Sequence, residues 1–456
     1  MRIFHQSSVG NMYFCIGIIR NTRIMHRNII EQLKVWKNKK GRKPLVLAGA
    51  RQVGKTYILK HFGEQEFANV AYINCDNNEL ARNLFSEDYD MRRILLAIGA
   101  ITGQSIEAGK TLIILDEIQE APRGLSVLKY FYENAPQYHV AVAGSLLGIA
   151  MHRGESFPVG KVDVLHIYPM TFDEFLLAKG KKQMVDILRA KDWATVKLLK
   201  NEYVKSLREY YFVGGMPEAV AEFVSSNDAR KVRTVQNNIL FTYRQDMSKH
   251  VPTSEANRIG MVWQSMPSQL VKENKKFIYG VVRPGARAKD FEAAIQWLLD
   301  AGLVYKAERI SQPKIPLKFY ADISAFKLFL LDCGLLGAMS ETPAERLLIA
   351  DNGMEEAKGA FTENYVMSQL TATCESSVFY YSNDAKLEID FIIQHGSDIV
   401  PIEVKAEENL RSKSLACFVA ANKGLHGLRF SMSDYRNQDW MTNVPLYAAP
   451  ILFRDN

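Results

Sequence analysis

Four residues near the beginning of the chain have the types and spacing of a phosphate-binding loop. They form the pattern G-x-x-x-x-G-K-T and are Gly49, Gly54, Lys55 and Thr56. Glycine lets the backbone approach a phosphate closely, and N–H groups at a helix N-terminus attract anions. Lys55 can offer a positive charge to the β- and γ-phosphates, and Thr56 a hydroxyl ligand for Mg²⁺. The pattern therefore predicts a site for ATP and Mg²⁺.

Two adjacent carboxylates, Asp116 and Glu117, follow the apolar run 111–115. We expect Asp116 to hold Mg²⁺ through water, and Glu117 to orient and deprotonate the water that attacks the γ-phosphate. Alone, such a pair is more often a solvated strand end. Occurring together with the phosphate loop, it favours a nucleotide site. Ser145 follows another apolar run, and it could sense the γ-phosphate or cap a helix.

A second charged group lies in the C-terminal third, where E-I-D ends at Asp390 and E-V-K runs from Glu403 to Lys405. Alternate residues of a strand share a face, so Glu403 and Lys405 point the same way, and Asp390 on a neighbouring strand can meet them. Two carboxylates can hold Mg²⁺, a lysine can stabilise developing charge, and Glu363 could be a further ligand. The group predicts a nuclease-like site. The alternative is an amphipathic hairpin with one solvated face.

The elements expected around the first site alternate between strands and helices. The predicted strands cover 45–48, 70–74, 111–116, 140–143 and 162–167. Helices are expected at 27–37, after the phosphate loop, over most of 80–101, and at 125–134. This alternation predicts a parallel sheet with helices on both faces.

Helices at 192–212 and 228–249, interrupted by V-G-G-M-P, are expected to form a lid on the nucleotide domain. Helices at 254–270 and 288–299, a strand at 303–308 and a proline-containing turn then follow the order of a winged helix. This region contains six basic residues and two acidic ones, and this excess of positive charge suits contacts to DNA phosphates. The basic residues are Lys272, Lys275, Lys276, Arg283, Arg287 and Lys289, and the acidic ones are Glu273 and Asp290. A lid or a protein-binding module is an equal alternative.

The segment between the two regions contains further candidates. Thr171 is a natural helix N-cap, with Glu174 placed to complete a capping box, and its expected role is structural. Arg153 and Lys161 are cations that could stabilise the transition state, in the same chain or in a neighbouring subunit. A surface position is the more common alternative for each of them.

Composition limits the class of protein. The 456 residues are enough for several domains, and the net charge of +7 is a modest basic bias that is compatible with nucleic acid. The five cysteines are scattered without a metal-site pattern, which suits a reducing cytoplasm. No apolar run is long enough for a membrane span. Residues 1–24 are expected to be a poorly ordered extension, with Met25 as a plausible true start.

Several motifs occur in an order that marks a resemblance: GARQVGKT, LIILDEIQ, AGSLLG, FPVGK followed by YPMTFDEFL, GGMPEAV, and EID followed by IEVK. From Arg27 onwards the chain resembles prokaryotic AAA-type ATP-binding proteins that carry a C-terminal PD-(D/E)XK nuclease-like domain of unassigned function. The resemblance implies nucleotide contact over 49–56, including Gln52 and Val53. It places the nuclease-type positions on the residues Asp390, Glu403 and Lys405.

The resemblance implies an α/β fold: a P-loop NTPase parallel sheet at 25–178, a helical lid with a winged helix at 179–335, and a restriction-endonuclease-like domain at 336–456. Two departures are visible. Many relatives have Gly-Arg where this chain has Gly160 and Lys161, and the acid before the E-x-K strand is set in E-I-D instead of P-D.

The expected function is ATP binding and hydrolysis coupled to DNA handling through the winged helix and the C-terminal domain, with metal-dependent cleavage in addition. A homo-oligomer is a further expectation. The alternative is an ATP-gated switch that binds a protein partner and whose nuclease-like domain is inactive. A regulator that binds DNA without regard to ATP is a third, weaker reading.

Overall fold

The structure is a computed structural model, and it describes residues 25–76, 78–144, 157–249, 251–272, 276–348, 355–383, 387–408 and 411–454. Several predictions from the sequence fall outside these ranges. They concern the extension 1–24, Ser145, Arg153, Glu273 and Lys275.

The first sheet has five strands in the order β2-β3-β4-β1-β5, and all neighbouring strands are parallel. The strands are β1 (Leu45–Ala48), β2 (Asn69–Asn74), β3 (Thr111–Asp116), β4 (His139–Ala143) and β5 (Asp163–His166). Each predicted strand is confirmed to within a residue or two at each end. The unbroken apolar runs arise because β1, β3 and β4 are buried on both faces.

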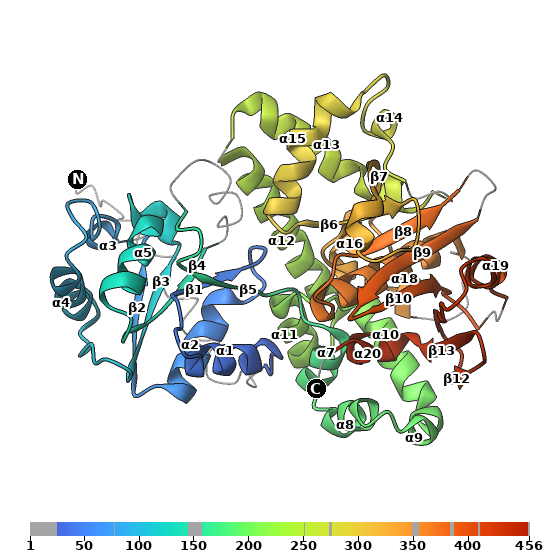
Figure 1. The fold of residues 1–456 in the computed structure, drawn as a ribbon, viewed down its shortest axis with the longest axis horizontal. Coiled ribbons are helices and arrows are strands. Elements are labelled where there is room, and N and C mark those ends of the chain that lie inside the picture. The colour runs from blue at the N-terminus through green and yellow to red at the C-terminus, as the bar shows by residue number, and fades with distance from the viewer. Residues whose placement is uncertain are drawn as a thin grey trace, which may run out of the picture.

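Helices cover both faces of this sheet (Figure 1). They are α1 (Ile29–Asn38), α2 (Lys55–Glu66), α3 (Glu79–Arg82), α4 (Met91–Thr102) and α5 (Gly124–Asn134). Leu45 and Leu47 pack into one hydrophobic core with α2, whereas Val46 packs into another with α4 and α5. The helical stretch predicted over 80–101 is two helices, because Asp90 caps a new start at α4 through its side chain.

A set of helices follows. These helices are α7 (Phe172–Ala178), α8 (Lys182–Arg189), α9 (Trp193–Leu198), α10 (Lys200–Val213), α11 (Pro217–Ser226), α12 (Ala229–Lys249), α13 (Thr253–Leu270), α14 (Tyr279–Val282) and α15 (Ala288–Asp300). Of these, α11 and α12 lie between the two sheets in Figure 1, α13, α14 and α15 lie at the top of the view, and α8 and α9 lie at the bottom. The capping box predicted at Thr171 and Glu174 is confirmed at the start of α7. The single helix predicted over 192–212 is the pair α9 and α10.

The second sheet is mixed and has eight strands in the order β12-β13-β11-β10-β9-β8-β6-β7. The strands are β6 (Val304–Ile310), β7 (Ala321–Leu330), β8 (Phe379–Ser382), β9 (Glu388–His395), β10 (Asp398–Val404), β11 (Gly427–Ser431), β12 (Arg436–Asn437) and β13 (Met441–Pro445). Helices α16 (Cys333–Met339), α17 (Ala344–Leu348), α18 (Glu355–Thr373), α19 (Lys413–Ala421) and α20 (Ala449–Leu452) complete this part.

The β6–β7 hairpin belongs to this second sheet, because β6 pairs in parallel with β8 from Glu308 to Ile310. The sequence predicts the wing of a winged helix here and a domain boundary after residue 335. The sheet therefore contains strands from both sides of that predicted boundary. Strands β7, β12 and β13 were not predicted from the sequence.

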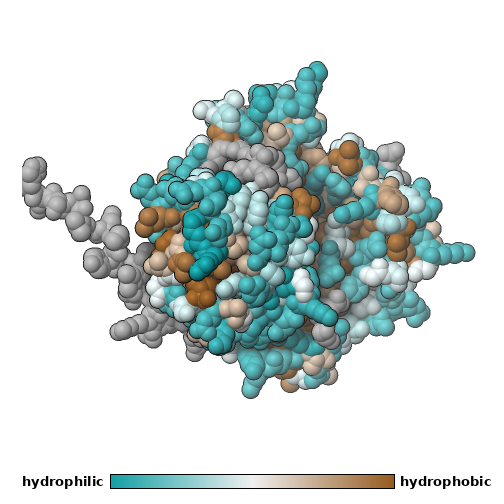
Figure 2. Space-filling view, turned by 60° about the vertical axis from the view of Figure 1, so that its left-hand side comes forward, coloured by the Kyte–Doolittle hydropathy of each residue, from teal (hydrophilic) through white to brown (hydrophobic). Residues whose placement is uncertain are grey.

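One large hydrophobic core links the two sheets. It extends from Leu47 on β1 through Tyr210 on α10 to Val366 on α18 and Phe391 on β9. A smaller core lies on the other face of the second sheet, where Leu415 of α19 packs. On the face shown in Figure 2 the surface is largely hydrophilic, with hydrophobic areas gathered in a few places. Within the described ranges, no helix is long and apolar enough to cross a membrane.

Candidate nucleotide-binding site

The phosphate loop joins β1 to α2 with a backbone that requires glycine at two positions. Gly54 caps α2 with a φ of 96°, and Gly49 has a φ of 155°. A Cβ atom at Gly49 would lie 2.2 Å from the carbonyl oxygen of Ile167, just after β5. Gln52 also has a positive φ of 65°. The loop thus has the strand–loop–helix geometry in which backbone N–H groups at a helix N-terminus can surround phosphate.

Lys55 is buried at the first position of α2 and is held against the loop. Its Nζ donates hydrogen bonds to the carbonyl oxygens of Gly49 and Ala50 at 2.9 and 2.8 Å. Burial lowers the pKa of Lys55 to about 8, although the charges of Glu117 and Asp116 act in the opposite direction. Phosphate oxygens would replace these neutral carbonyl partners with negative charge, which would favour the protonated lysine.

Thr56 and Asp116 lie together at the carboxyl end of β3. The hydroxyl of Thr56 donates to Asp116 Oδ2 at 2.8 Å, and the hydroxyl of Tyr72 donates to the same oxygen at 3.0 Å. Burial raises the pKa of Asp116, an effect that these hydrogen bonds and Lys55 oppose. Proteins hold Mg²⁺ in nucleotide sites through one or two oxygen ligands, with phosphates and water completing the shell. The residues present therefore fit Mg²⁺ bound between this pair and a triphosphate.

Glu117 follows β3 in the left-handed backbone region, with φ 49° and ψ 43°. This conformation is uncommon for a residue with a side chain, and such outliers occur often at functional sites. Gln119 Nε2 donates a hydrogen bond to its carboxylate. The charge of Glu117 acts on the pKa values of both Lys55 and Asp116. The predicted water-activating residue therefore lies with them at the carboxyl ends of the strands.

Residues distant in sequence contact the backbone of the loop, and sequence reasoning missed them. Arg27, before α1, is buried and donates from Nη1 to the carbonyl oxygen of Val53 at 2.9 Å. Its Nε lies 3.2 Å from Glu174 Oε2, so the capping-box glutamate of α7 also holds this arginine. The signal in the sequence was the buried acidic pair of YPMTFDEFL, which needs a basic partner.

Helix α12 contacts the loop with two side chains. The hydroxyl of Tyr243 donates to the carbonyl oxygen of Arg51 at 2.8 Å, and the side chain of Arg51 forms an ion pair with Asp246. Tyr243 and Asp246 are separated by three residues and therefore lie on one face of the helix. The loop is thus tied to the longest helix of the segment predicted to be a lid.

Helices α11 and α15 also reach the loop. A Cβ atom at Gly54 would lie 3.6 Å from Cγ of Pro217, the first residue of α11. A Cβ atom at Gly302, just after α15, would lie 3.3 Å from the backbone nitrogen of Ala50. A cavity of about 530 Å³ is lined by both residues of this contact, Gly302 and Ala50. Three helices of the segment predicted to contain the lid and the winged helix therefore touch the loop at different points.

Lys161 lies away from the phosphate loop. It lies two residues before β5, and the first residue of β5, Asp163, is paired with the first residue of β1, Leu45. The phosphate loop follows the last residue of β1, at the carboxyl ends of the strands. Lys161 therefore lies at the opposite, amino ends of the strands. Its Nζ forms an ion pair with Glu133 at 2.9 Å. This placement argues against a role for Lys161 in the nucleotide site of its own chain.

The charged residues predicted in the C-terminal third lie near one another on the second sheet. Lys405 Nζ forms an ion pair with Glu403 Oε1 at 2.8 Å. Asp390 Oδ2 accepts a hydrogen bond from the backbone N–H of Val404 at 2.8 Å. Burial alone would lower the pKa of Lys405, but Glu403, Asp390 and Glu363 outweigh it and raise the pKa. These four charged side chains therefore influence one another.

One further charged residue, Lys327, was missed. Lys327 of β7 is almost fully buried and forms an ion pair with Glu388, and Glu363 and Asp390 help to raise its pKa against the effect of burial. One oxygen of Glu403, Oε2, is buried without a hydrogen-bond partner. Among the described residues, however, no group of three or more histidine, cysteine, aspartate or glutamate side chains is arranged to hold a metal ion. The nuclease role of Asp390, Glu403 and Lys405 therefore stays a prediction.

Comparisons with known proteins agree with the phosphate-loop geometry. Residues 41–176 match the family model of an AAA domain. Residues 204–346 match a domain of unknown function, DUF8612, and residues 358–448 match another, DUF4143. No curated protein matches the chain. The predicted AAA-type P-loop domain is thus confirmed, whereas the model that matches the C-terminal part has no assigned function.

Several solved structures share limited similarity with the chain. The Walker-type ATPase of Pyrococcus abyssi is 14% identical, with a TM-score of 0.45 over 70% of this chain and 98% of that one. The Thermotoga maritima RuvB Holliday junction branch migration motor is 13% identical, with a TM-score of 0.31 over 62% and 92%. The Aeropyrum pernix ORC1 protein in complex with DNA is 13% identical, with a TM-score of 0.29 over 72% and 96%.

Proposed function

We propose that this protein is an ATP-hydrolysing switch whose nucleotide state changes the contacts between the phosphate loop and helices α11, α12 and α15. The observation that carries the proposal is the hydrogen bond from Tyr243 to Arg51 together with the ion pair between Arg51 and Asp246. These contacts join a phosphate loop of the AAA type directly to α12, a helix of 21 residues.

In the proposed binding step, Lys55 leaves the carbonyl oxygens of Gly49 and Ala50 and contacts the β- and γ-phosphates. The N–H groups of the loop bind the same phosphates, with Gln52, Val53 and Gly54 at the bend. Thr56 and Asp116 would hold Mg²⁺, which neutralises phosphate charge when bound. Ser145 remains a candidate γ-phosphate sensor.

In the proposed hydrolytic step, Glu117 accepts a proton from the attacking water. The oxygen of that water bonds to the γ-phosphorus while the bond from the γ-phosphorus to the β–γ bridging oxygen breaks. Loss of the γ-phosphate removes negative charge beside Lys55. The lysine can then return to its carbonyl partners, and the loop can return to its present contacts with α11, α12 and α15. Hydrolysis would thereby reset the switch.

The C-terminal domain is proposed to bind a partner instead of cleaving DNA. Support comes from the state of the predicted catalytic residues: Lys405 is paired with Glu403, and Asp390 accepts the N–H of Val404. A metal-dependent nuclease needs carboxylates that converge on a cation. The restriction-endonuclease-like fold remains a proposal for the sheet β8–β13, and the winged helix remains one for α13–β7.

Hydrolysis is tested by replacing Glu117 with glutamine, which keeps the size of the side chain and removes the base. We expect Glu117→Gln to bind ATP with unchanged affinity and to hydrolyse it at least one hundred times more slowly. The measurement is phosphate release at saturating ATP, beside the titration of a fluorescent ATP analogue. Glu120→Gln, at a partly exposed position three residues further on, is the matched control. Unchanged turnover in Glu117→Gln would exclude Glu117 as the base.

DNA contact by the basic cluster of the predicted winged helix is a second candidate. Its support is the exposure of four basic residues, Lys272, Arg283, Arg287 and Lys289. If they contact phosphates, duplex affinity should fall linearly with the logarithm of salt concentration, and each alanine substitution should lower that slope by about one. Fluorescence anisotropy with a labelled duplex measures this. A slope unchanged in Arg283→Ala and Lys289→Ala would exclude the cluster.

A further inference from the structure

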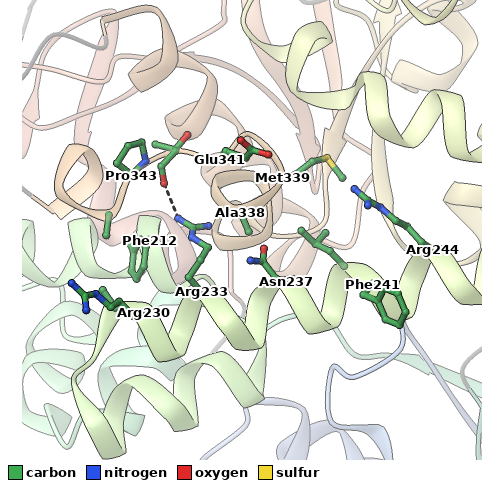
Figure 3. Close-up of a pocket in the computed structure, with 14 residues that line it drawn as sticks. Phe212, Arg230, Arg233, Asn237, Phe241, Arg244, Ala338, Met339, Glu341 and Pro343 are labelled. Atoms are coloured by element: carbon green, nitrogen blue, oxygen red, sulfur yellow. Dashed lines mark hydrogen bonds between the residues drawn. The ribbon is translucent and has the colours of Figure 1, made fainter.

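A cavity of about 790 Å³ lies between α12 and the segment that joins α16 to α17 (Figure 3). One wall is the face of α12 that carries Arg230, Arg233, Asn237, Phe241 and Arg244. The other wall comes from residues 338–344. No residue of the phosphate loop lines it, so this cavity is separate from the nucleotide site.

The cavity has a positive charge excess. Its lining includes three arginines, Arg230, Arg233 and Arg244, and one acidic residue among those described, Glu341. Arg230 and Arg244 are exposed. Within the described part of the chain, none of the three guanidinium groups forms an ion pair with a carboxylate. Three cations gathered at one hollow without acidic partners favour an anionic ligand.

Arg233 is the least exposed of the three arginines. Its Nη2 donates to the carbonyl oxygen of Thr342 at 2.9 Å, and its guanidinium lies 4.9 Å from the ring centre of Phe212. Its Nη1 is buried and has no hydrogen-bond partner. Nη1 itself is shielded from the cavity and lies near Gly337 of α16, so an entering carboxylate would be attracted by the charge of the guanidinium as a whole. Arg233 therefore marks the point at which an acidic group would bind.

The apolar lining and the length of the site indicate the kind of ligand. Phe241 is 62% exposed, and Leu240 and Met339 also line the cavity. Arg230 and Arg244 are 14 residues apart on α12, which is about 21 Å of helix. An extended peptide covers that length with about six or seven residues. A flexible glutamate side chain can enter the hollow to reach Arg233, whereas phosphates fixed on a rigid duplex cannot.

We propose that this cavity binds an extended segment of a partner protein in which two or three carboxylates alternate with apolar side chains. One carboxylate contacts Arg233, and the others contact Arg230 and Arg244. The apolar side chains pack on Phe241 and Met339. Charge complementarity selects this segment, and the apolar contacts add to its affinity.

The same helix connects this cavity to the nucleotide site. Arg244 lines the cavity, while its neighbour Tyr243 and the nearby Asp246 contact Arg51 of the phosphate loop. A change in the loop that moves α12 also moves the arginine face against residues 338–344. This part of the inference rests on the proposed ATP switch, whereas the binding of the peptide does not.

The test uses the full-length protein and a fluorescein-labelled eight-residue peptide of alternating glutamate and leucine. Binding is followed by fluorescence anisotropy without nucleotide, with ADP, and with ATP in the Glu117→Gln background. Arg233→Gln, which keeps a donor for Thr342, and Arg244→Ala should each weaken binding at least tenfold. Lys231→Ala, at an exposed position of α12 outside the cavity, is the matched control and should bind normally.

Two competing probes decide the class of ligand. A glutamine–leucine peptide should bind at least tenfold more weakly than the acidic one, and a 12-nucleotide single strand should not displace it. If the single strand displaces the peptide, and if Arg233→Gln and Arg244→Ala also weaken binding of the strand, the ligand of the cavity would be nucleic acid and not a peptide. No binding of the acidic peptide, or equal binding by Arg233→Gln and Arg244→Ala, would overturn the proposal.

Coupling is tested separately with Tyr243→Phe, which removes only the hydroxyl that bonds to Arg51. We expect peptide affinity to differ between the ADP and ATP states of the parent protein and to lose that difference in Tyr243→Phe. If the peptide binds equally well in all nucleotide states, the cavity is still a peptide-binding site, but the coupling to the nucleotide site is refuted. Absence of ATP binding would instead refute the proposed function and leave the peptide result unaffected.

Discussion

At the scale of single residues, the nucleotide site combines groups whose properties are set by burial. Lys55 is buried beside two carbonyl oxygens, and Asp116 is buried beside two hydroxyls. Burial disfavours the charged form of each side chain, so the pKa of Lys55 is lowered and that of Asp116 is raised. A bound triphosphate with Mg²⁺ would supply the opposite charges to both. The site is therefore best stabilised when it is loaded.

Replacement of Lys55 by alanine should abolish this stabilisation. In the parent protein, ATP at about one hundred times its Kd should add about 2.7 kcal/mol to the free energy of unfolding. In Lys55→Ala, the same ATP concentration should add almost nothing, because the main cation for the phosphates is absent. The measurement is the thermal unfolding midpoint with and without Mg²⁺-ATP. Lys60→Ala, on the next turn of α2, is the control, and an equal shift in Lys55→Ala would refute the assignment.

At the scale of elements, the segment V-G-G-M-P sets the position of the lid helices. Gly215 donates from its backbone N–H to the buried carboxylate of Asp332, which also caps α16 through Leu335. A Cβ atom at Gly215 would lie 2.1 Å from the carbonyl oxygen of Met170 and 2.9 Å from the hydroxyl of Tyr210. The chain therefore passes through this point only with glycine, and α11 starts immediately after it.

Gly215→Ala should consequently lower the free energy of unfolding by about 3 kcal/mol, because backbone atoms and not flexible side chains oppose the new methyl group. Chemical denaturation followed by circular dichroism measures this change. Gly260→Ala is the matched control: it lies on α13 with no atom within 4 Å of its Cβ position, so stability should be unchanged or slightly increased. Equal stability of the two variants would contradict the packing described here.

At the scale of the whole molecule, Asp173 of α7 connects the two ends of the described chain. Its carboxylate is fully buried and lies 3.0 Å from Arg189 and 2.6 Å from Arg454, and it accepts a hydrogen bond from Asn28 at 3.2 Å. Burial by itself would raise the pKa of Asp173. The charge of Arg454 and the hydrogen bonds from Arg454, Thr171 and Arg189 outweigh burial and hold it below its usual range.

This network predicts a dependence of stability on pH. The pKa of Asp173 is lower in the folded than in the unfolded state. Its contribution to the free energy of unfolding is therefore complete above about pH 4 and is lost as the pH falls through the pKa of the folded state. Asp173→Asn should cost about 3 kcal/mol at pH 7 and should flatten this acid part of the profile. Urea unfolding between pH 2 and 7 measures both effects. Glu107→Gln, in an exposed pair with Lys110, should change stability by less than about 0.5 kcal/mol.

Much of the first sheet and of its site could be predicted because the signals are local. The strand before Gly49, the glycines of the loop and the carboxylates after β3 are continuous in sequence, and periodicity and turn chemistry report such features. The capping box at Thr171 is local in the same way. The second sheet was predicted less well. Strand β7 was missed. Strand β6 was assigned to a winged helix and not to this sheet, because its pairing with β8 joins residues about 70 positions apart.

The sequence by itself determined the phosphate loop, its strand–loop–helix setting and the residue types for binding ATP and Mg²⁺. The tertiary structure alone decided which distant side chains complete that site, namely Arg27, Tyr243 and Asp246. It also decided that Lys161 lies at the opposite, amino ends of the strands of its sheet and that the arginines of α12 share a cavity with residues 338–344. The reason is physical: backbone conformation depends on neighbours along the chain, whereas contacts depend on how separate elements bury their apolar faces against one another.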